Sequence, residues 1–196
     1  MNRKYIIWGV IALVLLFLIS SYNGMVGSRQ ATNEAWAEVQ SAYQRRLDLI
    51  DNLVNVVKGS ADFEKSTLQA VVEARAKATS INVNADDLTP DKIKQIQSEQ
   101  AQLGGAFGRL LAVAENYPQL RTTEAFMKLQ DQEEGTENRI KIARDNFSHA
   151  VMSYNSSIQI FPRNIMAGLF GFKQRAYFES EAGADKAPKI DFSKPK

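Results

Sequence analysis

The N-terminal stretch of this chain constrains its fold more than any other, because it is long, apolar and almost free of charge. No charged residue lies between Lys4 and Arg29. A helix over residues 5–22 rises by about 1.5 Å per residue, which brings it close to the roughly 30 Å of a bilayer's hydrocarbon core. We therefore predict a transmembrane anchor at residues 1–24. Its apolar side chains are Ile6, Ile7, Trp8, Val10, Leu13, Leu15, Leu16, Phe17, Leu18 and Ile19.

A cleavable signal peptide is the alternative for this stretch. It would also have a short basic start, an apolar run and small residues such as Ser20 and Gly24 after the run. The run lies at the upper length for a signal peptide and leads straight into a helical pattern, which favours an anchor that is kept. Arg3 and Lys4 face only Arg29 on the other side of the run, so the positive-inside rule predicts a cytoplasmic N-terminus and an exported body.

Helical periodicity fills the rest of the chain. Apolar residues recur at spacings of three and four in residues 31–58, 62–80, 90–116 and 123–161, so each range predicts an amphipathic helix. No run of period two is long enough for a strand. Amphipathic helices joined by short connections pack as antiparallel bundles, since each apolar stripe must be buried. The predicted fold is all-α: an N-terminal transmembrane helix followed by an elongated, coiled-coil-like antiparallel four-helix bundle at residues 25–161.

The chain of an antiparallel bundle returns to the membrane after the fourth helix, where residues 162–180 mix aromatic and aliphatic side chains with cations. This mixture suits the bilayer interface, so we predict a membrane-proximal amphipathic segment. The alternative, which is compatible with the first, is that the segment caps the open end of the bundle core. A disordered tail is expected at residues 181–196. The membrane-proximal residues are Ile165, Met166, Leu169, Phe170, Phe172, Lys173 and Arg175.

Two further features of the predicted helices are not explained by one apolar stripe each. Polar residues interrupt the stripes, and such groups need partners when they are buried. They predict either a polar layer that sets the helix register or a ligand pocket. A second apolar strip on the first helix predicts a self-association surface. The polar layer is Arg46, Gln100, Glu133, Thr136 and Glu137, and the self-association strip is Leu49, Leu53 and Val56.

The residues that usually carry chemistry are scarce. The chain has no cysteine and 1 histidine, His149, which the periodicity places on the solvent face, so a zinc site would need several carboxylates. The glycine-rich stretch 104–108 has no preceding strand and no following lysine, which disfavours a phosphate loop, and we expect its glycines to allow close helix packing. The net charge is +2 without a basic block. We predict no catalytic residue, metal, cofactor, nucleic acid or small-molecule substrate.

Short motifs from about Tyr22 to Glu179 resemble the LemA family and occur in the same order. In the N-terminal half they are Tyr22-Asn23, Ala35-Trp36, Arg45-Arg46-Leu47-Asp48-Leu49-Ile50, Asn52-Leu53-Val54 and Val57-Lys58-Gly59. In the C-terminal half they are Glu115-Asn116-Tyr117-Pro118, Leu129-Gln130, Thr136-Glu137-Asn138-Arg139-Ile140, Ala143-Arg144, Tyr154-Asn155, Phe161-Pro162 and Gly171-Phe172. Two positions depart from the family pattern, which often has a proline where Asp51 stands and an aromatic residue where Ser60 stands.

The resemblance implies a bacterial, membrane-anchored protein with an all-helical body and no agreed enzymatic activity. A relative in magnetosome-forming bacteria is associated with membrane invagination. We therefore predict a non-enzymatic, self-assembling scaffold that organises or shapes the inner membrane of the bacterial envelope, with its body in the periplasm. Its expected partners are membrane lipids, further copies of itself and an envelope protein. The alternative is an adaptor or regulator that recruits an envelope protease or signals envelope stress.

Overall fold

Most of the part that the structure describes is helical. A computed structural model describes residues 3–59, 63–79 and 83–178, and no strand occurs within these ranges. The all-α prediction is therefore confirmed for the described residues, while the tail predicted at 181–196 lies outside them. The elements are α1 (Arg3–Lys58), α2 (Lys65–Thr79), the short 3-10 helix η1 (Ala85–Asp87), α3 (Pro90–Ala114), α4 (Pro118–Arg121), α5 (Glu124–Gln159) and α6 (Arg163–Leu169).

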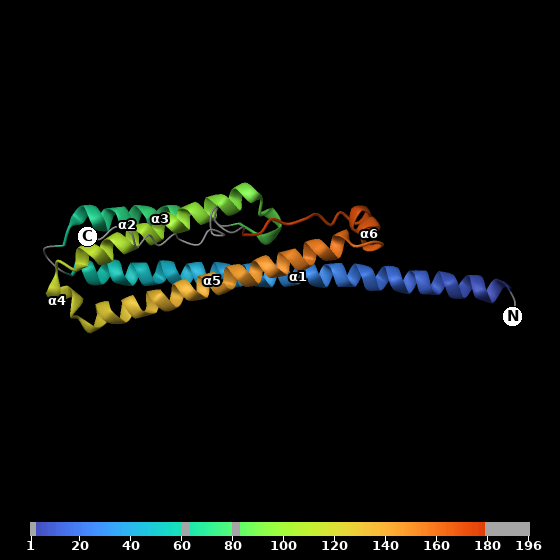
Figure 1. The fold of residues 1–196 in the computed structure, drawn as a ribbon, viewed down its shortest axis with the longest axis horizontal. Helices are drawn as coiled ribbons and strands as arrows, with labels where there is room; N and C mark the ends of the chain where they lie inside the picture. The colour runs from blue at the N-terminus through green and yellow to red at the C-terminus, as the bar shows by residue number, and fades with distance from the viewer. Residues whose placement is uncertain (1–2, 60–62, 80–82, 179–196) are drawn as a thin grey trace, which may run out of the picture.

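The first helix joins the apolar N-terminal stretch to the body without a break. α1 has 56 residues, which corresponds to about 84 Å at 1.5 Å per residue. Its N-terminal part extends beyond all other elements (Figure 1). The boundary that the sequence predicts after residue 24 therefore falls inside a helix, and the apolar stretch and the body share one continuous rod.

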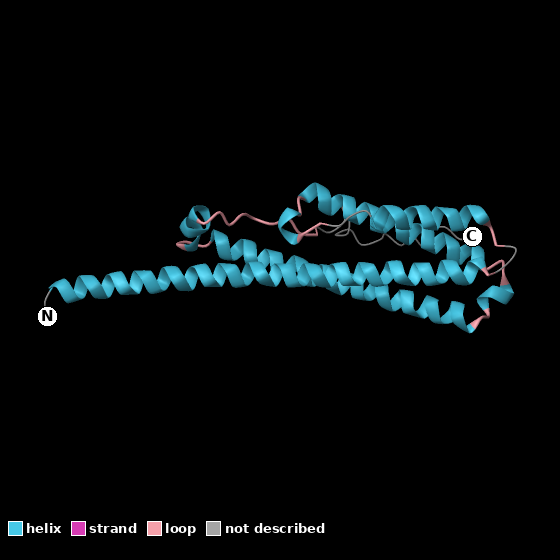
Figure 2. Ribbon diagram, turned by 180° about the vertical axis from the view of Figure 1, so that it is seen from behind, coloured by secondary structure: helices cyan, strands magenta, loops and turns pink. Residues whose placement is uncertain are grey.

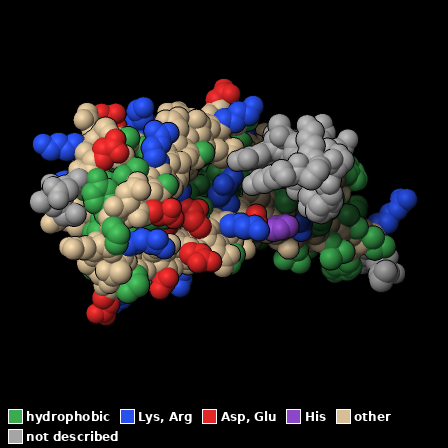
Figure 3. All heavy atoms as spheres, turned by 60° about the vertical axis from the view of Figure 1, so that its left-hand side comes forward, with side chains coloured by type: hydrophobic (Ala, Val, Ile, Leu, Met, Phe, Trp, Pro, Cys, Tyr) green, Lys and Arg blue, Asp and Glu red, His purple; other side chains and the backbone are tan. Residues whose placement is uncertain are grey.

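The longer helices pack as two antiparallel pairs. α1 packs mainly against α5, and α2 packs mainly against α3. The α2–α3 pair lies along the end of α1 that is far from the N-terminus, whereas α5 follows α1 over a greater length (Figure 2). Acidic and basic side chains are interspersed over the face of the body in Figure 3. This face has no field of a single sign of the kind that attracts nucleic acid.

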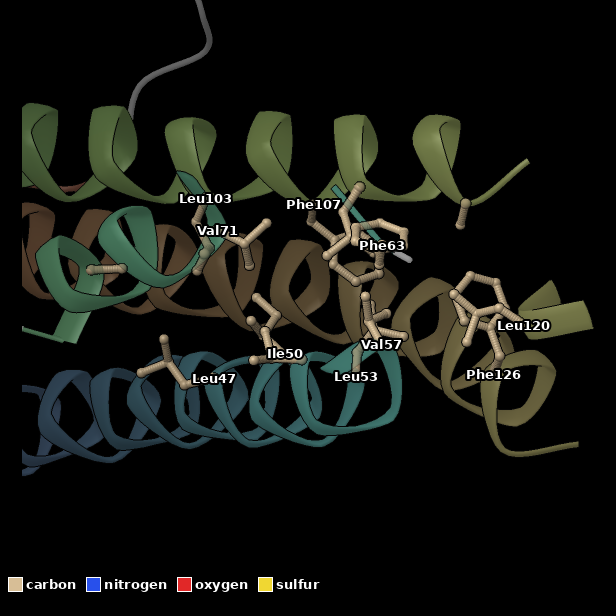
Figure 4. Close-up of a cluster of buried hydrophobic side chains, with 14 residues drawn as sticks. Leu47, Ile50, Leu53, Val57, Phe63, Val71, Leu103, Phe107, Leu120 and Phe126 are labelled. Atoms are coloured by element: carbon tan, nitrogen blue, oxygen red, sulfur yellow. The ribbon is translucent and has the colours of Figure 1, made fainter. Parts of the chain in front are cut away.

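Three clusters of buried side chains follow one another along the body. The distal cluster, far from the N-terminus, draws residues from α1, α2, α3, α4 and α5 (Figure 4). The middle cluster surrounds Trp36, Phe147 and Phe178. The third cluster, beside the apolar stretch, contains Met25 and Tyr154. Because α1 and α5 contribute to all three clusters, this pair forms the spine of the body.

The predicted self-association strip is wrong. Leu49 is 8% exposed and Leu53 is 2% exposed, and Val56 packs against the distal cluster. The prediction assumed that each helix buries one stripe. α1 has α5 on one side and the α2–α3 pair on another, so it buries a broader surface and leaves no spare apolar strip at these positions.

The helix ends follow local signals in the sequence. Thr89 caps α3 by accepting a hydrogen bond of 3.2 Å from the backbone N–H of Lys92, and Pro90 occupies the first turn, as predicted. Thr123 caps α5 in the same way, at 3.3 Å from the N–H of Phe126. The short helix α4 was not predicted, and it turns the chain between α3 and α5.

Candidate membrane interface and buried polar layer

The N-terminal part of α1 has no protein partner. Among the described residues, this is the 1 helix that is long and apolar enough to cross a membrane, with a mean hydropathy of 2.3 and only 6% of its most apolar window buried. The apolar side chains predicted for the anchor, from Ile6 to Ile19, are all exposed. Burial begins at Ser21 and Met25, which are 2% and 0% exposed. The apolar stretch is therefore not a core helix, and the body starts where it ends.

Helix α6 lies against α1 at the end of the apolar stretch. The ring of Tyr22 is 5.1 Å from the ring of Phe170 and 5.8 Å from that of Phe172, measured between centroids. A Cβ atom at Gly24 would lie 3.8 Å from the guanidinium of Arg163. Met166 joins the buried cluster beside the apolar stretch. The chain thus returns to this end of α1, as the alternating path of the helices predicts.

The outer side of α6 presents a group of exposed apolar side chains, which we call the apolar collar. Leu169 is 80% exposed, Ile165 is 65% exposed and Phe170 is 54% exposed. Contiguous apolar surface rimmed by polar groups marks an interaction site, and Arg163 and Lys173 stand close to these residues in the sequence. The collar consists of Ile160, Phe161, Ile165, Leu169 and Phe170.

Three of the predicted membrane-proximal residues do not belong to this surface: Met166, Arg175 and Phe172, which is half-buried and packs against the third cluster. Met166 is 6% exposed and Arg175 is 8% exposed, so both are part of the body. α6 is amphipathic and turns Met166 inward. After Gly171, whose φ of 73° is in the left-handed region that glycine tolerates, the chain doubles back along the body. The predicted segment therefore divides into an exposed collar and a continuation in which Arg175 and Phe178 are buried.

We call this continuation, residues 172–178, the C-terminal strap. The Asn155 side chain pairs with the backbone of Arg175, accepting from its N–H at 2.9 Å and donating to its carbonyl at 2.8 Å. The hydroxyl of Tyr154 donates to the carbonyl of Lys173 at 2.9 Å. Phe178 packs its ring against Phe147 at 5.8 Å. Asn155 was missed as a site residue, although a polar amide in the apolar stripe of α5 was the signal for it.

The side chain of Arg175 links three elements of the body. It donates to the side chain of Asn33 at 2.8 Å and to the carbonyl of Arg29 at 3.2 Å, and it pairs with Asp86 of η1. Arg29 also pairs with Asp86, at 2.9 Å. Hydrogen bonds from Arg29 and Arg175 hold the pKa of Asp86 below its ordinary value. The strap is thereby attached to α1 and η1 as well as to α5.

Three residues of the predicted polar layer, Gln100, Glu133 and Glu137, meet around the fourth, Arg46, which is 4% exposed. Its guanidinium donates to the side-chain and backbone oxygens of Gln100 at 3.2 and 3.3 Å, and it lies 3.4 Å from Glu133. It also pairs with Glu137. Thr136 is buried but donates to the carbonyl of Gln132 in its own helix at 2.8 Å, so it stands apart from the cluster.

Of the glycines at positions 104, 105 and 108 of α3, Gly104 lies close to this cluster and the other two do not. A Cβ atom at Gly104 would come within 2.8 Å of the Arg46 guanidinium, whereas nothing lies within 4 Å of one at Gly105 or Gly108. Gly104 therefore makes room for a buried arginine side chain. The expected role of the other two glycines in close packing within the body is not seen.

Burial leaves the polar layer incompletely hydrogen-bonded. Neither carboxylate oxygen of Glu133 has a hydrogen-bond partner among the described residues. Desolvation raises the pKa of Glu133 from 4.5 to about 7, against the opposing effect of Arg46 and with a further rise from Glu137. Burial likewise raises the pKa of Tyr43 to about 12, opposed mainly by Arg144. The layer thus holds a carboxyl group that exchanges its proton near neutral pH.

The described residues offer no metal centre. No group of three or more histidine, cysteine, aspartate or glutamate side chains within these ranges is placed to hold a metal ion. His149, predicted to face solvent, is exposed. The two features that the described residues form are therefore the exposed apolar collar and the buried polar layer around Arg46.

Comparison with known proteins gives relatives over most of the chain. The chain is 26% identical over 185 residues to magnetosome protein MamQ 2 of Paramagnetospirillum magneticum, and the match covers 86% of this chain and 68% of that protein. It is 23% identical over 187 residues to magnetosome protein MamQ of Magnetospirillum gryphiswaldense, with the same coverage of 86% and 68%. It is 23% identical over 171 residues to protein LemA of Metamycoplasma hominis, covering 87% and 74%. The model of the LemA family matches residues 35–192. The chain with this apolar helix and helical body therefore belongs to the LemA family, a membership that the order of its sequence motifs predicted.

Proposed function

We propose that the protein is a non-enzymatic, membrane-anchored scaffold of the bacterial envelope that organises or shapes the membrane at the base of its body. In this proposal residues 5–22 of α1 span the inner membrane and the two helix pairs act as one elongated four-helix bundle outside it. The observation that carries the proposal is the position of the apolar collar, beside the point where the apolar part of α1 ends.

The collar supplies a second contact with the lipid. Burying a large apolar side chain contributes roughly 1.5–3 kcal/mol, so the collar as a whole contributes several kcal/mol when it enters the bilayer interface. Arg163 and Lys173 stand close to the collar residues in the sequence, and cations beside an inserted apolar surface reach anionic headgroups. The transmembrane part of α1 and the apolar collar beside it are both attached to one continuous helix. Together they couple the orientation of the body to the surrounding lipid.

Two observations on relatives agree with this role. The chain is similar to magnetosome proteins of two bacteria, and magnetosomes are membrane compartments. The LemA family match covers the helical body.

By the positive-inside rule, Arg3 and Lys4 favour a cytoplasmic N-terminus and a periplasmic body. Protease added to spheroplasts is then expected to digest the body, and protection until lysis would reverse this orientation.

The contact of the collar with lipid can be tested on the full chain, because it has no cysteine. We would label Leu169→Cys with a fluorophore in liposomes and add a quencher attached to the lipid chains. Strong quenching is expected at this position. The control is Val72→Cys, a residue of α2 that is 43% exposed and far from the apolar stretch. Equal quenching at the two positions would show that the collar does not enter the membrane.

The shaping role has a separate test with matched variants. Full-length protein reconstituted at high density in liposomes is expected to cluster on the vesicles and to change their shape in electron micrographs. Leu169→Ser with Phe170→Ser should reduce this effect, whereas Val72→Ser with Met127→Ser, two distal exposed positions, should not. Unchanged vesicle shape with the parent protein would remove the shaping role. A monomer that purifies with one other envelope protein would instead support the adaptor.

A further inference from the structure

The end of the body beside the apolar stretch is short of acidic residues. The chain has no aspartate or glutamate before Glu34, and none in residues 146–178. These two stretches lie together, because Met25 and Tyr154 belong to one buried cluster. Figure 1 shows this end of the body, where α6 lies beside α1. Beyond the apolar stretch, the arginines and lysines that the two stretches contribute are Arg29, Arg163, Lys173 and Arg175.

Two of these four cations are engaged within the body. Arg175 is 8% exposed and pairs with Asp86 of η1. Arg29 pairs with the same carboxylate at 2.9 Å. Arg29 also lies seven residues beyond Tyr22, which corresponds to about 10 Å along α1. The polar headgroup layer extends only about 5–8 Å beyond the hydrocarbon core on each side of a bilayer, so Arg29 is set back from it.

Arg163 and Lys173 have no such partner. In the described part of the chain, no ion pair or hydrogen bond engages either side chain. Arg163 is half-buried, and its guanidinium lies against α1, 3.8 Å from where a Cβ atom of Gly24 would be. Gly24 is two residues beyond Tyr22, or about 3 Å along the helix. The guanidinium is therefore held at the height of the lipid headgroups when residues 5–22 span the membrane.

Lys173 starts from a similar height. It follows Phe172, whose ring centroid lies 5.8 Å from that of Tyr22. Two residues later, Arg175 donates to the carbonyl of Arg29 at 3.2 Å. The backbone of Lys173 therefore lies between the levels of Tyr22 and Arg29. Its side chain is exposed, and the flexible stem of a lysine extends along apolar surface so that the ammonium reaches the headgroups.

We propose that Arg163 and Lys173 bind the phosphate groups of anionic lipids and give the membrane contact of the body a preference for such lipids. A guanidinium offers a phosphate two parallel hydrogen bonds, and an ammonium attracts it as a point charge. A carboxylate partner in the body would cancel this attraction, and none of the described residues provides one for these two cations. The proposal rests on the proposed function, because the height of both side chains follows from residues 5–22 spanning the membrane.

The experiment compares two quenching lipids beside the collar of the full chain. The protein is labelled with a fluorophore at Leu169→Cys and reconstituted in mixed liposomes of phosphatidylglycerol, which is anionic, and phosphatidylcholine, which has no net charge. Either lipid carries bromine on its acyl chains in turn. One cation near an anionic surface is worth a factor of about five in affinity, so the association constant of phosphatidylglycerol at this position should be about fivefold higher. Arg163→Gln with Lys173→Gln should bring the two association constants close together.

Matched variants separate the two cations from the overall charge and from folding. Lys58→Gln with Arg121→Gln removes two exposed cations at the distal end and should keep the preference. Lys173→Gln alone changes only an exposed side chain, so it leaves the packing intact and should still lower the preference.

Equal quenching by the two lipids in the parent would overturn the proposal and would indicate an acidic protein surface as the partner of these cations. A double variant that keeps the parental preference would overturn it as well. If brominated phosphatidylcholine still quenches the label at position 169 in either case, the collar enters the membrane as the proposed function requires, and only the lipid preference is lost.

Discussion

Glu133 gives the sharpest prediction, because its burial makes the stability of the body depend on pH. The residue Glu133 is 5% exposed. The pKa of its carboxyl group rises from 4.5 to about 7 in the folded protein. The folded state therefore holds this proton more tightly than the unfolded chain. The stabilising contribution is fully present below about pH 4.5 and is lost as the pH rises through about 7. Since one pKa unit corresponds to about 1.4 kcal/mol, the loss is about 3 kcal/mol of the free energy of unfolding.

Glu133→Gln is expected to remove this loss, because the amide resembles the protonated acid. We would measure urea unfolding of the full chain in detergent micelles between pH 4.5 and 8. Trp36, which is 4% exposed, reports unfolding by its fluorescence in a Trp8→Phe background. The variant and the parent should be about equally stable near pH 4.5. At pH 8 the variant should be more stable by about 3 kcal/mol.

The control is Glu137→Gln, which removes the exposed acidic partner of Arg46. Arg46 is buried and Glu137 is half exposed, so loss of this pair should cost more than loss of a fully exposed pair, which costs about 0–1 kcal/mol, and this variant should be less stable than the parent at pH 8. If Glu133→Gln is equally stable or less stable than the parent at pH 8, the attraction to Arg46 outweighs desolvation and the reasoning is refuted. A difference that does not change between pH 5 and 8 would refute it as well.

Three further predictions concern packing. Asn155→Leu removes two hydrogen bonds to the C-terminal strap, so it should lower the free energy of unfolding by about 1–3 kcal/mol and speed tryptic cleavage within the strap; cleavage at the parental rate would mean that the strap is held by other contacts. Gly104→Ala should destabilise the body by displacing Arg46, whereas Gly105→Ala should stabilise it by up to about 1 kcal/mol, as urea titrations of both variants would show. Leu53→Ala should lower the free energy of unfolding by about 2–5 kcal/mol without changing the mass of the assembly. A smaller assembly would show that Leu53 takes part in a contact between subunits.

Local signals in the sequence were sufficient to predict the long helices. The apolar stretch before Arg29 predicted a transmembrane helix, because its length and lack of charge depend on no other part of the chain. The structure has an apolar helix there that is long enough to cross a membrane. Thr89 and Pro90 predicted the start of α3, because a helix cap involves only residues within one turn. The apolar spacing predicted α2, α3 and α5 to within a few residues. The order of the family motifs predicted membership of the LemA family.

The polar layer could be predicted in part. Polar side chains within apolar stripes indicated that Arg46, Gln100 and Glu133 need partners, and the structure brings them together. The stripe alone did not show that Thr136 is satisfied within its own helix. It also did not show that Gly104 makes room for Arg46, because that depends on how closely α3 approaches α1.

The surface and the core of α1 were decided by tertiary structure alone. Helical periodicity assigns a face to each side chain but does not count the neighbours of a helix, so Leu49 and Leu53 were placed on a surface that α5 and the α2–α3 pair bury. The composition of the segment after α5 is the same whether it lies flat on a membrane or folds back. The long-range pairing of Asn155 with Arg175 decides between these paths. It does so by satisfying the buried backbone of the strap, which leaves only the collar exposed beside the apolar end of α1.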